Sequence, residues 1–361
     1  MRVIMSCAGT GGHIYPAIAI ADKIKREDPS SEIIFIGTKK GMENRLVPAA
    51  GYEVKGIAAS GFNRKNPLKN FRTVADILQG SREASAIMEE FRPDMVIGTG
   101  GYVTGIVIRM AHKKGIPCYI HEQNAIPGMA NKMLEKYARK VFISFEDSRK
   151  YLKEPEKAVL TGNPIRNDFL RLDRESCRKE LGVGDGDLAV LAFGGSLGAE
   201  ILNKAVIRLS ENMPDGLKLF FVTGKRYYDD IASSMGSRAD GGRIVLIPYA
   251  DNMPQLILAS DLVISRAGAI AVSEITACGK PSVLIPSPNV TNNHQYHNAK
   301  AIADAGAAVL LEEKEFGADY SELADAVNAL AADSARMAEM SECARRAGRT
   351  DAVDLIYGNL K

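Results

Sequence analysis

Cysteine is scarce in this sequence, and the cysteines present form no recognisable motif. The five cysteines among 361 residues are far apart, odd in number and never arranged as a CxxC pair. This distribution excludes a small disulfide-stapled fold and a zinc module, and it favours a reducing cytoplasm. The cysteines are Cys7, Cys118, Cys177, Cys278 and Cys343.

Long apolar runs and a strong excess of one charge are also missing. No stretch reaches the roughly 18 to 20 consecutive apolar residues that a membrane-spanning helix needs. The opening run Met1–Cys7 is too short for the core of a signal peptide, so we expect a buried first strand there. The formal net charge of +2 excludes a broadly basic nucleic-acid binder. Any contact with a membrane is expected to be peripheral.

Two common nucleotide-binding motifs are absent as well. A Walker loop is excluded because no Gly-Lys-Ser/Thr follows a glycine-rich turn. A dinucleotide dehydrogenase needs a third glycine where Ile14 stands and an acidic residue after the next strand, which here ends Ile36-Gly37-Thr38-Lys39. No cluster of histidine and aspartate with metal-ligand spacing stands out, so we expect neither a metal nor a cofactor.

The sequence does contain a repeated alternation of short β-rich runs and longer helical patterns. Val3–Cys7 precedes a helical stretch at Tyr15–Glu27, and from Asp187 the same order of strand, glycine turn and helix begins again. The pattern predicts parallel strands joined by helices in two doubly wound α/β domains, because 361 residues exceed one ordinary core. Further strands are expected at 32–37, 95–98, 117–121, 140–144, 158–160, 218–223, 244–247, 262–265 and 282–285.

Three glycine-rich turns stand at the ends of predicted strands, at 9–13, 98–102 and 194–198. Such a turn, when it opens a helix, presents free backbone N–H groups at the positive end of the helix dipole, where phosphate is stabilised. Glycine also serves tight turns without a ligand, so one turn alone is weak evidence. Three of them favour ligand binding over turn geometry alone.

Two further features of the second half have alternative readings. Glu274 lies early in a predicted helix, where a carboxylate can accept both hydroxyls of a ribose but can also simply complement the helix dipole. The polar run 292–298 lies beyond the strand at 282–285, where open α/β sheets bind ligands. Its amides would read sugar hydroxyls, unless the run is a solvated loop.

Six motifs together resemble the MurG family of bacterial glycosyltransferases over nearly the whole chain. They are Gly-Thr-Gly-Gly-His-Ile-Tyr-Pro-Ala (9–17), Gly-Thr-Gly-Gly-Tyr-Val (98–103), His-Glu-Gln-Asn (121–124), Thr-Gly-Asn-Pro-Ile-Arg (161–166), Phe-Gly-Gly-Ser-Leu-Gly-Ala (193–199) and Ala-Val-Ser-Glu (271–274). The resemblance implies a GT-B fold, two Rossmann-like domains facing across a cleft. Residues 1–163, joined by a C-terminal helix at 341–361, would bind the acceptor lipid I, and residues 164–340 would bind the donor UDP-N-acetylglucosamine (UDP-GlcNAc).

The implied reaction is inverting transfer of N-acetylglucosamine to the C4 hydroxyl of the N-acetylmuramyl group of lipid I, giving lipid II and UDP for peptidoglycan. By the same resemblance, Arg166 and Ser196 would contact the donor diphosphate, and Glu274 the ribose. Gln295 and Asn124 would read the sugar with the first glycine turn. The remaining implied contacts are Thr10, Gly11 and Gly12 in that turn, and Ala250, Ala269, Ile270, Ala271, Val272 and Ser273 at the uridine.

The general base that takes the acceptor proton has more than one candidate. His13 ends the first glycine turn, and histidine is the side chain best suited to proton transfer near neutral pH, although a histidine can also simply cap a helix. His121 and Glu122 form a second candidate pair at a strand end. The sequence does not choose between them. Arg166 and the helix after Ser196 would neutralise the leaving group without a metal.

A lipid-linked acceptor implies work at the cytoplasmic face of the bacterial membrane. Arg64, Lys65, Lys69 and Arg72 alternate with Phe62, Leu68 and Phe71 without an acidic residue, a pattern suited to an anionic lipid surface. Val74, Ile77 and Leu78 would either extend this face or belong to the core. The resemblance also implies cell-wall synthesis and division proteins as candidate partners.

Two departures from the family pattern and two rival functions remain. Ile106 stands where many members have proline, and His294-Gln295 stands where many have two glutamines, which leaves the role of His294 open. A UDP-GlcNAc 2-epimerase, or a transferase for another lipid, shares the same type of fold. A nucleotide-sugar sensor without catalysis is the rival outside the enzymes.

Overall fold

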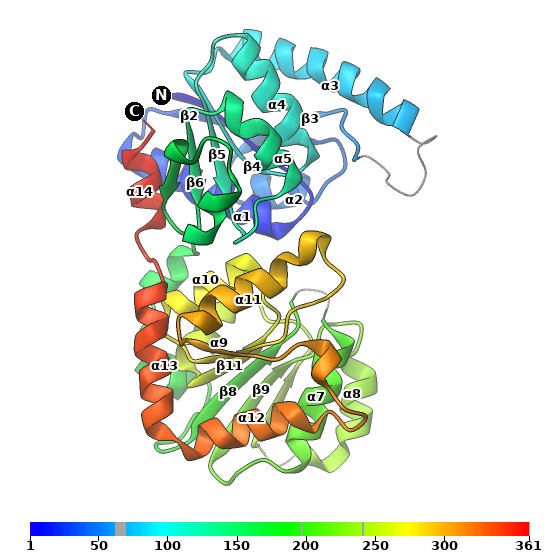
Figure 1. Cartoon of the computed structure of the whole chain (residues 1–361), viewed down its shortest axis with the longest axis vertical. Coiled ribbons are helices and arrows are strands. Elements are labelled where there is room, and N and C mark those ends of the chain that lie inside the picture. The colour runs from blue at the N-terminus through cyan, green and yellow to red at the C-terminus, as the bar shows by residue number, and fades with distance from the viewer. Residues whose placement is uncertain (62–69, 196–197, 240–241, 361) are drawn as a thin grey trace. The chain divides into compact units, whose positions relative to one another are not determined.

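The computed structural model describes residues 1–61, 70–195, 198–239 and 242–360 (Figure 1). The chain divides into two compact units. The first unit is Met1–Ile165 together with Asp351–Lys361, and the second unit is Arg166–Thr350. Each unit has its own parallel sheet, so the predicted α/β class with two doubly wound domains is confirmed.

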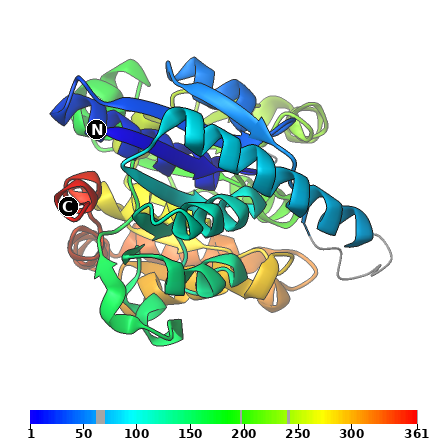
Figure 2. The same ribbon diagram turned by 90° about the horizontal axis from the view of Figure 1, so that it is seen from above.

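The first unit contains a seven-stranded sheet in the order β3-β2-β1-β4-β5-β6-β7, and every described pairing is parallel. Helices cover both faces, and the long α3 is seen along one of them in Figure 2. The strands are β1 (Arg2–Cys7), β2 (Glu32–Thr38), β3 (Glu53–Ile57), β4 (Met95–Gly100), β5 (Cys118–Glu122), β6 (Lys140–Ile143) and β7 (Ala158–Leu160). The α-helices are α1 (Gly11–Glu27), α2 (Glu43–Ala49), α3 (Asn70–Phe91), α4 (Tyr102–Lys113), α5 (Met129–Leu134) and α14 (Ala352–Gly358).

Strand β1, at the centre of this sheet, is mostly apolar and is buried from Val3 to Cys7 because helices cover both faces. In β1, Ile4 packs into the core beneath α3 and α4, whereas Val3 and Met5 pack into the core beneath α1. Successive side chains of a strand point to opposite faces, so a strand covered on both sides needs a continuous apolar run.

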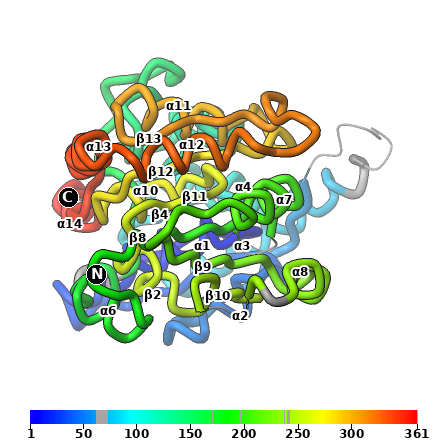
Figure 3. Tube along the Cα trace, turned by 90° about the horizontal axis from the view of Figure 1, so that it is seen from below, coloured from blue at the N-terminus to red at the C-terminus, as the bar shows by residue number. Residues whose placement is uncertain are grey.

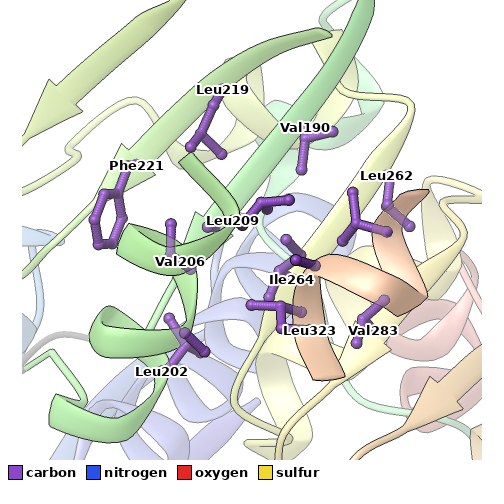
Figure 4. Packing of buried hydrophobic residues seen from close by; sticks show 14 of the residues in the cluster. Val190, Leu202, Val206, Leu209, Leu219, Phe221, Leu262, Ile264, Val283 and Leu323 are labelled. Atoms are coloured by element: carbon purple, nitrogen blue, oxygen red, sulfur yellow. The ribbon is translucent and has the colours of Figure 1, made fainter. Parts of the chain in front are cut away.

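The second unit has a six-stranded parallel sheet in the order β10-β9-β8-β11-β12-β13 (Figure 3). One of its cores lies between α7, α12 and the sheet, where Leu202 and Val206 of α7 meet Leu219 and Ile264 (Figure 4). The strands are β8 (Leu188–Phe193), β9 (Leu217–Val222), β10 (Ile244–Ile247), β11 (Leu262–Ser265), β12 (Ser282–Leu284) and β13 (Ala308–Leu310). The α-helices are α6 (Arg174–Glu180), α7 (Glu200–Glu211), α8 (Tyr228–Met235), α9 (Met253–Ala259), α10 (Ala269–Ala277), α11 (His294–Asp304), α12 (Ser321–Ala332) and α13 (Ser334–Ala347).

Both sheets reverse their strand order at the first strand of the unit. β1 lies between β2 and β4, and β8 lies between β9 and β11. In doubly wound sheets, ligands bind outside the carboxyl ends of the strands at this switch point. A ligand site is therefore expected at the loops after β1 and β4 in the first unit and after β8 and β11 in the second.

The chain returns to the first unit later than the expected position 341. Helix α13 stays with the second unit, where Met340 is buried in its core and Oγ of Ser341 donates to the carbonyl of Gly279 at 2.7 Å. Only α14 joins the first unit. Its Ile356 is buried beside α1, and Lys23 forms an ion pair with Asp354 at 2.5 Å.

Candidate active site

A pocket of about 360 Å³ opens at the switch point of the second unit. The loop after β8 contributes glycines to it, and α10 and α11 contribute residues from their first turns. Helices α7, α10 and α11 thus all begin at or beside this pocket, and backbone N–H groups at helix starts attract anions. The described lining residues are Phe193, Gly194, Gly195, Gly198, Ala199, Arg266, Gly268, Ala271, Ser287 and Gln295.

Arg266 supplies a fixed positive charge to the pocket. Its side chain is only 12% exposed, donates to the carbonyl of Ile285 at 3.0 Å and pairs with Glu313. A guanidinium held in this way is suited to phosphate oxygens. Sequence reasoning gave this residue no role, although an arginine directly after a buried strand was a usable signal.

Gln295 lies in the pocket with a defined orientation. Its Oε1 accepts a hydrogen bond from the backbone N–H of Ser287 at 2.9 Å, so its amide NH₂ is the end that remains to donate to a ligand. The neighbouring His294 instead turns toward its own loop, where Nδ1 lies 2.8 Å from the carbonyl of Thr291. The structure therefore assigns pocket contact to Gln295 and a local role to His294.

Arg166 and Glu274 lie together rather than at the glycine turn. Nε of Arg166 donates to Oε1 of Glu274 at 2.9 Å, and the guanidinium also lies over the ring of Phe169. Burial raises the pKa of Glu274, and the charge of Arg166 opposes that rise. Neither side chain is among the described residues that line the pocket.

Of the other residues expected to contact the donor, some line the pocket and others do not. Ala269, Ile270, Ala271, Val272 and Ser273 form the first turns of α10, and Ala271 lines the pocket. Ala250 follows β10 and is partly exposed, but it is not among the described residues that line the pocket. Ser196, expected at the diphosphate, lies outside the described residues. Among the described side chains, no group of three or more His, Cys, Asp or Glu is arranged to hold a metal ion.

In the first unit, the turn after β1 opens α1 and presents His13. Thr10 is the N-cap residue, and its carbonyl accepts from the backbone N–H of His13 at 3.0 Å. Gly11 and Gly12 form the start of the helix, whose first turn has no acidic residue, so its N–H groups can attract an anion.

The neighbouring turn after β4 packs directly against His13. Gly100 has φ +125°, and a Cβ at this position would overlap the imidazole ring. Oγ1 of Thr99 donates to the backbone carbonyl of His13 at 2.7 Å. Two glycine turns that are far apart in sequence therefore form one surface in the first unit.

His13, Gln123 and His121 form a hydrogen-bonded chain. Nδ1 of His13 lies 3.1 Å from Oε1 of Gln123, and Nε2 of Gln123 lies 2.9 Å from Nδ1 of His121. His121 is fully buried, which lowers its pKa to about 4. His13 is the partly exposed end of the chain. Gln123 was not a site residue in the sequence-based expectation.

The carboxylate of Glu122 is occupied by its own loop. Oε1 accepts from the backbone and side-chain amides of Asn124 at 2.9 and 3.2 Å. Oε2 accepts from the backbone N–H of Gly128 at 2.9 Å and from Nδ2 of Asn131 at 2.7 Å. Glu122 is 2% exposed. This geometry favours a role in holding Asn124 in place over a role as the base.

The segment expected to dock on a membrane lies mostly outside the described residues, which exclude 62–69 and the side chains of 70–72. Helix α3 shows which of its three apolar residues are exposed and which one belongs to the core. Val74 and Leu78 are 49% and 60% exposed, whereas Ile77 packs against the core. Within the part of the chain that the structure describes, no helix is both long and apolar enough to cross a bilayer.

Two domain models cover most of the chain. Residues 3–143 match the glycosyltransferase family 28 N-terminal domain, and residues 189–356 match the glycosyltransferase family 28 C-terminal domain. The two matches fall mainly in the first and second unit, respectively.

Relatives of known name agree with these matches. A UDP-N-acetylglucosamine--N-acetylmuramyl-(pentapeptide) pyrophosphoryl-undecaprenol N-acetylglucosamine transferase of Acetivibrio thermocellus is 44% identical over 363 residues, covering 100% of this chain and 98% of the relative. The crystal structure of Acinetobacter baumannii MurG superposes with a TM-score of 0.80 at 28% identity, covering 99% and 98% of the two chains.

A UDP-GlcNAc 2-epimerase from Neisseria meningitidis also superposes, with a TM-score of 0.70 over 100% of this chain and 99% of the other. At 14% identity this likeness shows a shared fold only. The resemblance seen in the sequence motifs is thus confirmed by full-length relatives and by structure. The chain belongs to the MurG family of N-acetylglucosamine transferases, within glycosyltransferase family 28.

Proposed function

We infer that the protein transfers N-acetylglucosamine from UDP-GlcNAc to lipid I, forming lipid II and UDP in peptidoglycan synthesis. The observation that carries this conclusion is the 44% identity, over the whole chain, with a transferase of that name.

The pocket of the second unit is the proposed donor site. The start of α7, just after Gly198 and Ala199, and the guanidinium of Arg266 are suited to the diphosphate. The amide NH₂ of Gln295 is suited to a sugar hydroxyl. Glu274 remains the proposed ribose acceptor, with Arg166 acting through it. The same positive groups stabilise the UDP anion as the bond to the sugar breaks.

The first unit is the proposed acceptor side, and His13 is the proposed base. An inverting transfer removes the proton from the C4 hydroxyl of the acceptor while its oxygen bonds to C1 of N-acetylglucosamine. The electron pair of the broken C1–O bond stays on the β-phosphate of UDP. His13 is partly exposed, whereas His121 is buried and the carboxylate of Glu122 accepts hydrogen bonds from its own loop. The N–H groups of Gly11 and Gly12 suit the diphosphate of lipid I.

We also propose that the protein works peripherally at the cytoplasmic face of the membrane. The acceptor is attached to a lipid, and the exposed Val74 and Leu78 of α3 follow the basic segment 64–72 directly in sequence. Basic residues beside exposed apolar ones bind anionic lipid surfaces. Binding to cell-wall synthesis or division proteins stays a prediction from the family resemblance.

A direct test is incubation of the protein with UDP-GlcNAc and a short-chain lipid I analogue. We expect a disaccharide-lipid product and equimolar UDP, with no UDP-N-acetylmannosamine. The variant His13→Gln should bind UDP normally and lose turnover. His112→Gln, a change at an exposed position of α4, is the matched control. Epimer without lipid product contradicts the proposed function, and so does UDP-GlcNAc binding without any turnover.

A further inference from the structure

We propose that Gln123 is a positioning residue that sets the tautomer of His13, leaving Nε2 of His13 as the basic atom. The inference rests on the proposed role of His13. It assigns to Gln123 a function in the reaction without contact with either substrate.

The orientation of the Gln123 amide is fixed by a backbone carbonyl. Nε2 of Gln123 lies 2.7 Å from the carbonyl oxygen of Thr99, and a carbonyl can only accept a hydrogen bond. The amide nitrogen must therefore face Thr99. Oε1 must then face His13, because it lies 3.1 Å from Nδ1 of that residue.

A second backbone carbonyl fixes the far end of the chain. Nε2 of His121 lies 3.2 Å from the carbonyl of Gly162, so this nitrogen carries the hydrogen. Burial keeps His121 neutral, and its Nδ1 is then an acceptor for the second N–H of Gln123 at 2.9 Å. The hydrogen bonds therefore all run in one direction, from His13 through Gln123 and His121 to Gly162.

This polarity determines which nitrogen of His13 carries the proton. Oε1 of Gln123 only accepts, so Nδ1 of neutral His13 must donate and Nε2 must hold the lone pair. Among the described residues, no group forms a hydrogen bond with Nε2 of His13. Gly100 leaves room for the ring in this position, since a side chain there would overlap it. The basic atom is thus defined, on a residue that is partly exposed.

Other charged groups near the turn are already bonded elsewhere. The carboxylate of Glu43 accepts from the backbone N–H groups of Thr38 and Gly9 at 2.8 and 3.3 Å. Glu122 is held by Asn124, Gly128 and Asn131. The neutral amide of Gln123 is therefore the group that directs the His13 ring.

The test compares Gln123→Met, which removes the acceptor, with Gln123→Glu, which keeps one for Nδ1. The full-length protein labelled with ¹⁵N at histidine reports the tautomer by NMR, with the His13 signals assigned by their loss in His13→Gln. Wild type and Gln123→Glu should show the hydrogen on Nδ1, and Gln123→Met should lose that preference. The kcat of Gln123→Met should fall roughly 10²-fold, with KM for UDP-GlcNAc within about twofold, and Gln123→Glu should restore much of it.

Three outcomes separate this proposal from its alternatives. An unchanged His13 tautomer in Gln123→Met overturns it, even if activity falls, because the role of Gln123 is then structural. Full activity in Gln123→Met also overturns it. If His13→Gln remains active while Gln123→Met shifts the tautomer, the positioning stands and the proposed base is wrong. Circular dichroism and urea unfolding show in each case whether the first unit of the variant is folded, because UDP binding reports on the second unit alone.

Discussion

Arg166 and Glu274 form an ion pair across 108 positions of sequence, with Nε of the arginine 2.9 Å from Oε1 of the carboxylate. Glu274 is 6% exposed, so its carboxylate is desolvated, and the arginine compensates its charge. The hydrogen bond from Arg166 orients the carboxylate of Glu274, and the charge of Arg166 opposes the rise in its pKa that burial causes. This pairing also gives Arg166 a role that does not require contact with the diphosphate.

The first prediction concerns this carboxylate and the ribose of the donor. Glu274→Gln should weaken UDP binding about tenfold, because a neutral amide loses a charge-assisted acceptor. The change should matter less for 2′-deoxy-UDP, measured by calorimetry on both proteins. Equal losses for the two ligands would contradict ribose recognition by Glu274. Glu339→Gln, at an exposed position of α13, is the control.

The second prediction concerns the fixed charge of the donor pocket. Arg266→Met should raise the Kd for UDP roughly 10- to 100-fold and reduce its salt dependence, because a guanidinium contact to phosphate is lost. Arg243→Met, an exposed arginine before β10, should change neither quantity. Glu313→Gln is measured as well, because Arg266→Met leaves the carboxylate of Glu313 unpaired and this could itself affect the pocket. Normal UDP binding by Arg266→Met would remove this residue from the donor site.

The third prediction concerns the glycine that accommodates His13. Gly100→Ala should lower kcat at least about tenfold and destabilise the fold by roughly 1–3 kcal/mol, because the new methyl group overlaps the imidazole and φ is +125°. Gly105→Ala in α4 meets nothing within 4 Å and should stabilise by up to about 1 kcal/mol without loss of turnover. Activity and urea unfolding of both variants check the pair. Equal kcat values for the two variants would contradict close packing of Gly100 on His13.

The fourth prediction concerns pH and the buried His121, whose pKa is lowered by burial to about 4. Between pH 6.5 and 4 the unfolded chain binds a proton here and the folded chain does not, so this residue makes stability fall as pH falls. The loss should reach about 3 kcal/mol near pH 4. Urea unfolding across this range should show a slope that is smaller by about one proton in His121→Gln but unchanged in His112→Gln. An unchanged slope in His121→Gln would show that His121 is protonated in the folded protein.

The sequence was sufficient for much of the fold because the strands are buried on both faces and end in glycine turns. β1 and β8 were predictable on that basis. β3 was not predicted, since Glu53–Ile57 mixes polar residues with a glycine, and β13 was missed although β7 and β12 are equally short and were predicted. Short or half-polar strands depend on their neighbours in the sheet more than on their own sequence.

The candidate site was less predictable because its contacts join distant segments. The motif at 121–124 identified an important strand end but did not distinguish between its side chains. Their roles follow from partners elsewhere, such as Gly162 for His121 and Asn131 for Glu122. Arg266 was missed for the same reason, because its place in the pocket and its pairing with Glu313 are seen only in the folded structure.

The late return of α14 to the first unit has a consequence for synthesis. Residues 166–350 are contiguous and leave the ribosome before α14. The first unit needs α14, because its Ile356 packs into the core beside α1 and its Asp354 pairs with Lys23. The second unit can therefore complete its core during translation, whereas the first must wait with the apolar face of α1 partly uncovered. Translation that stops before α14 would release a chain with a complete second unit and an incomplete first unit, a natural target for quality-control proteases.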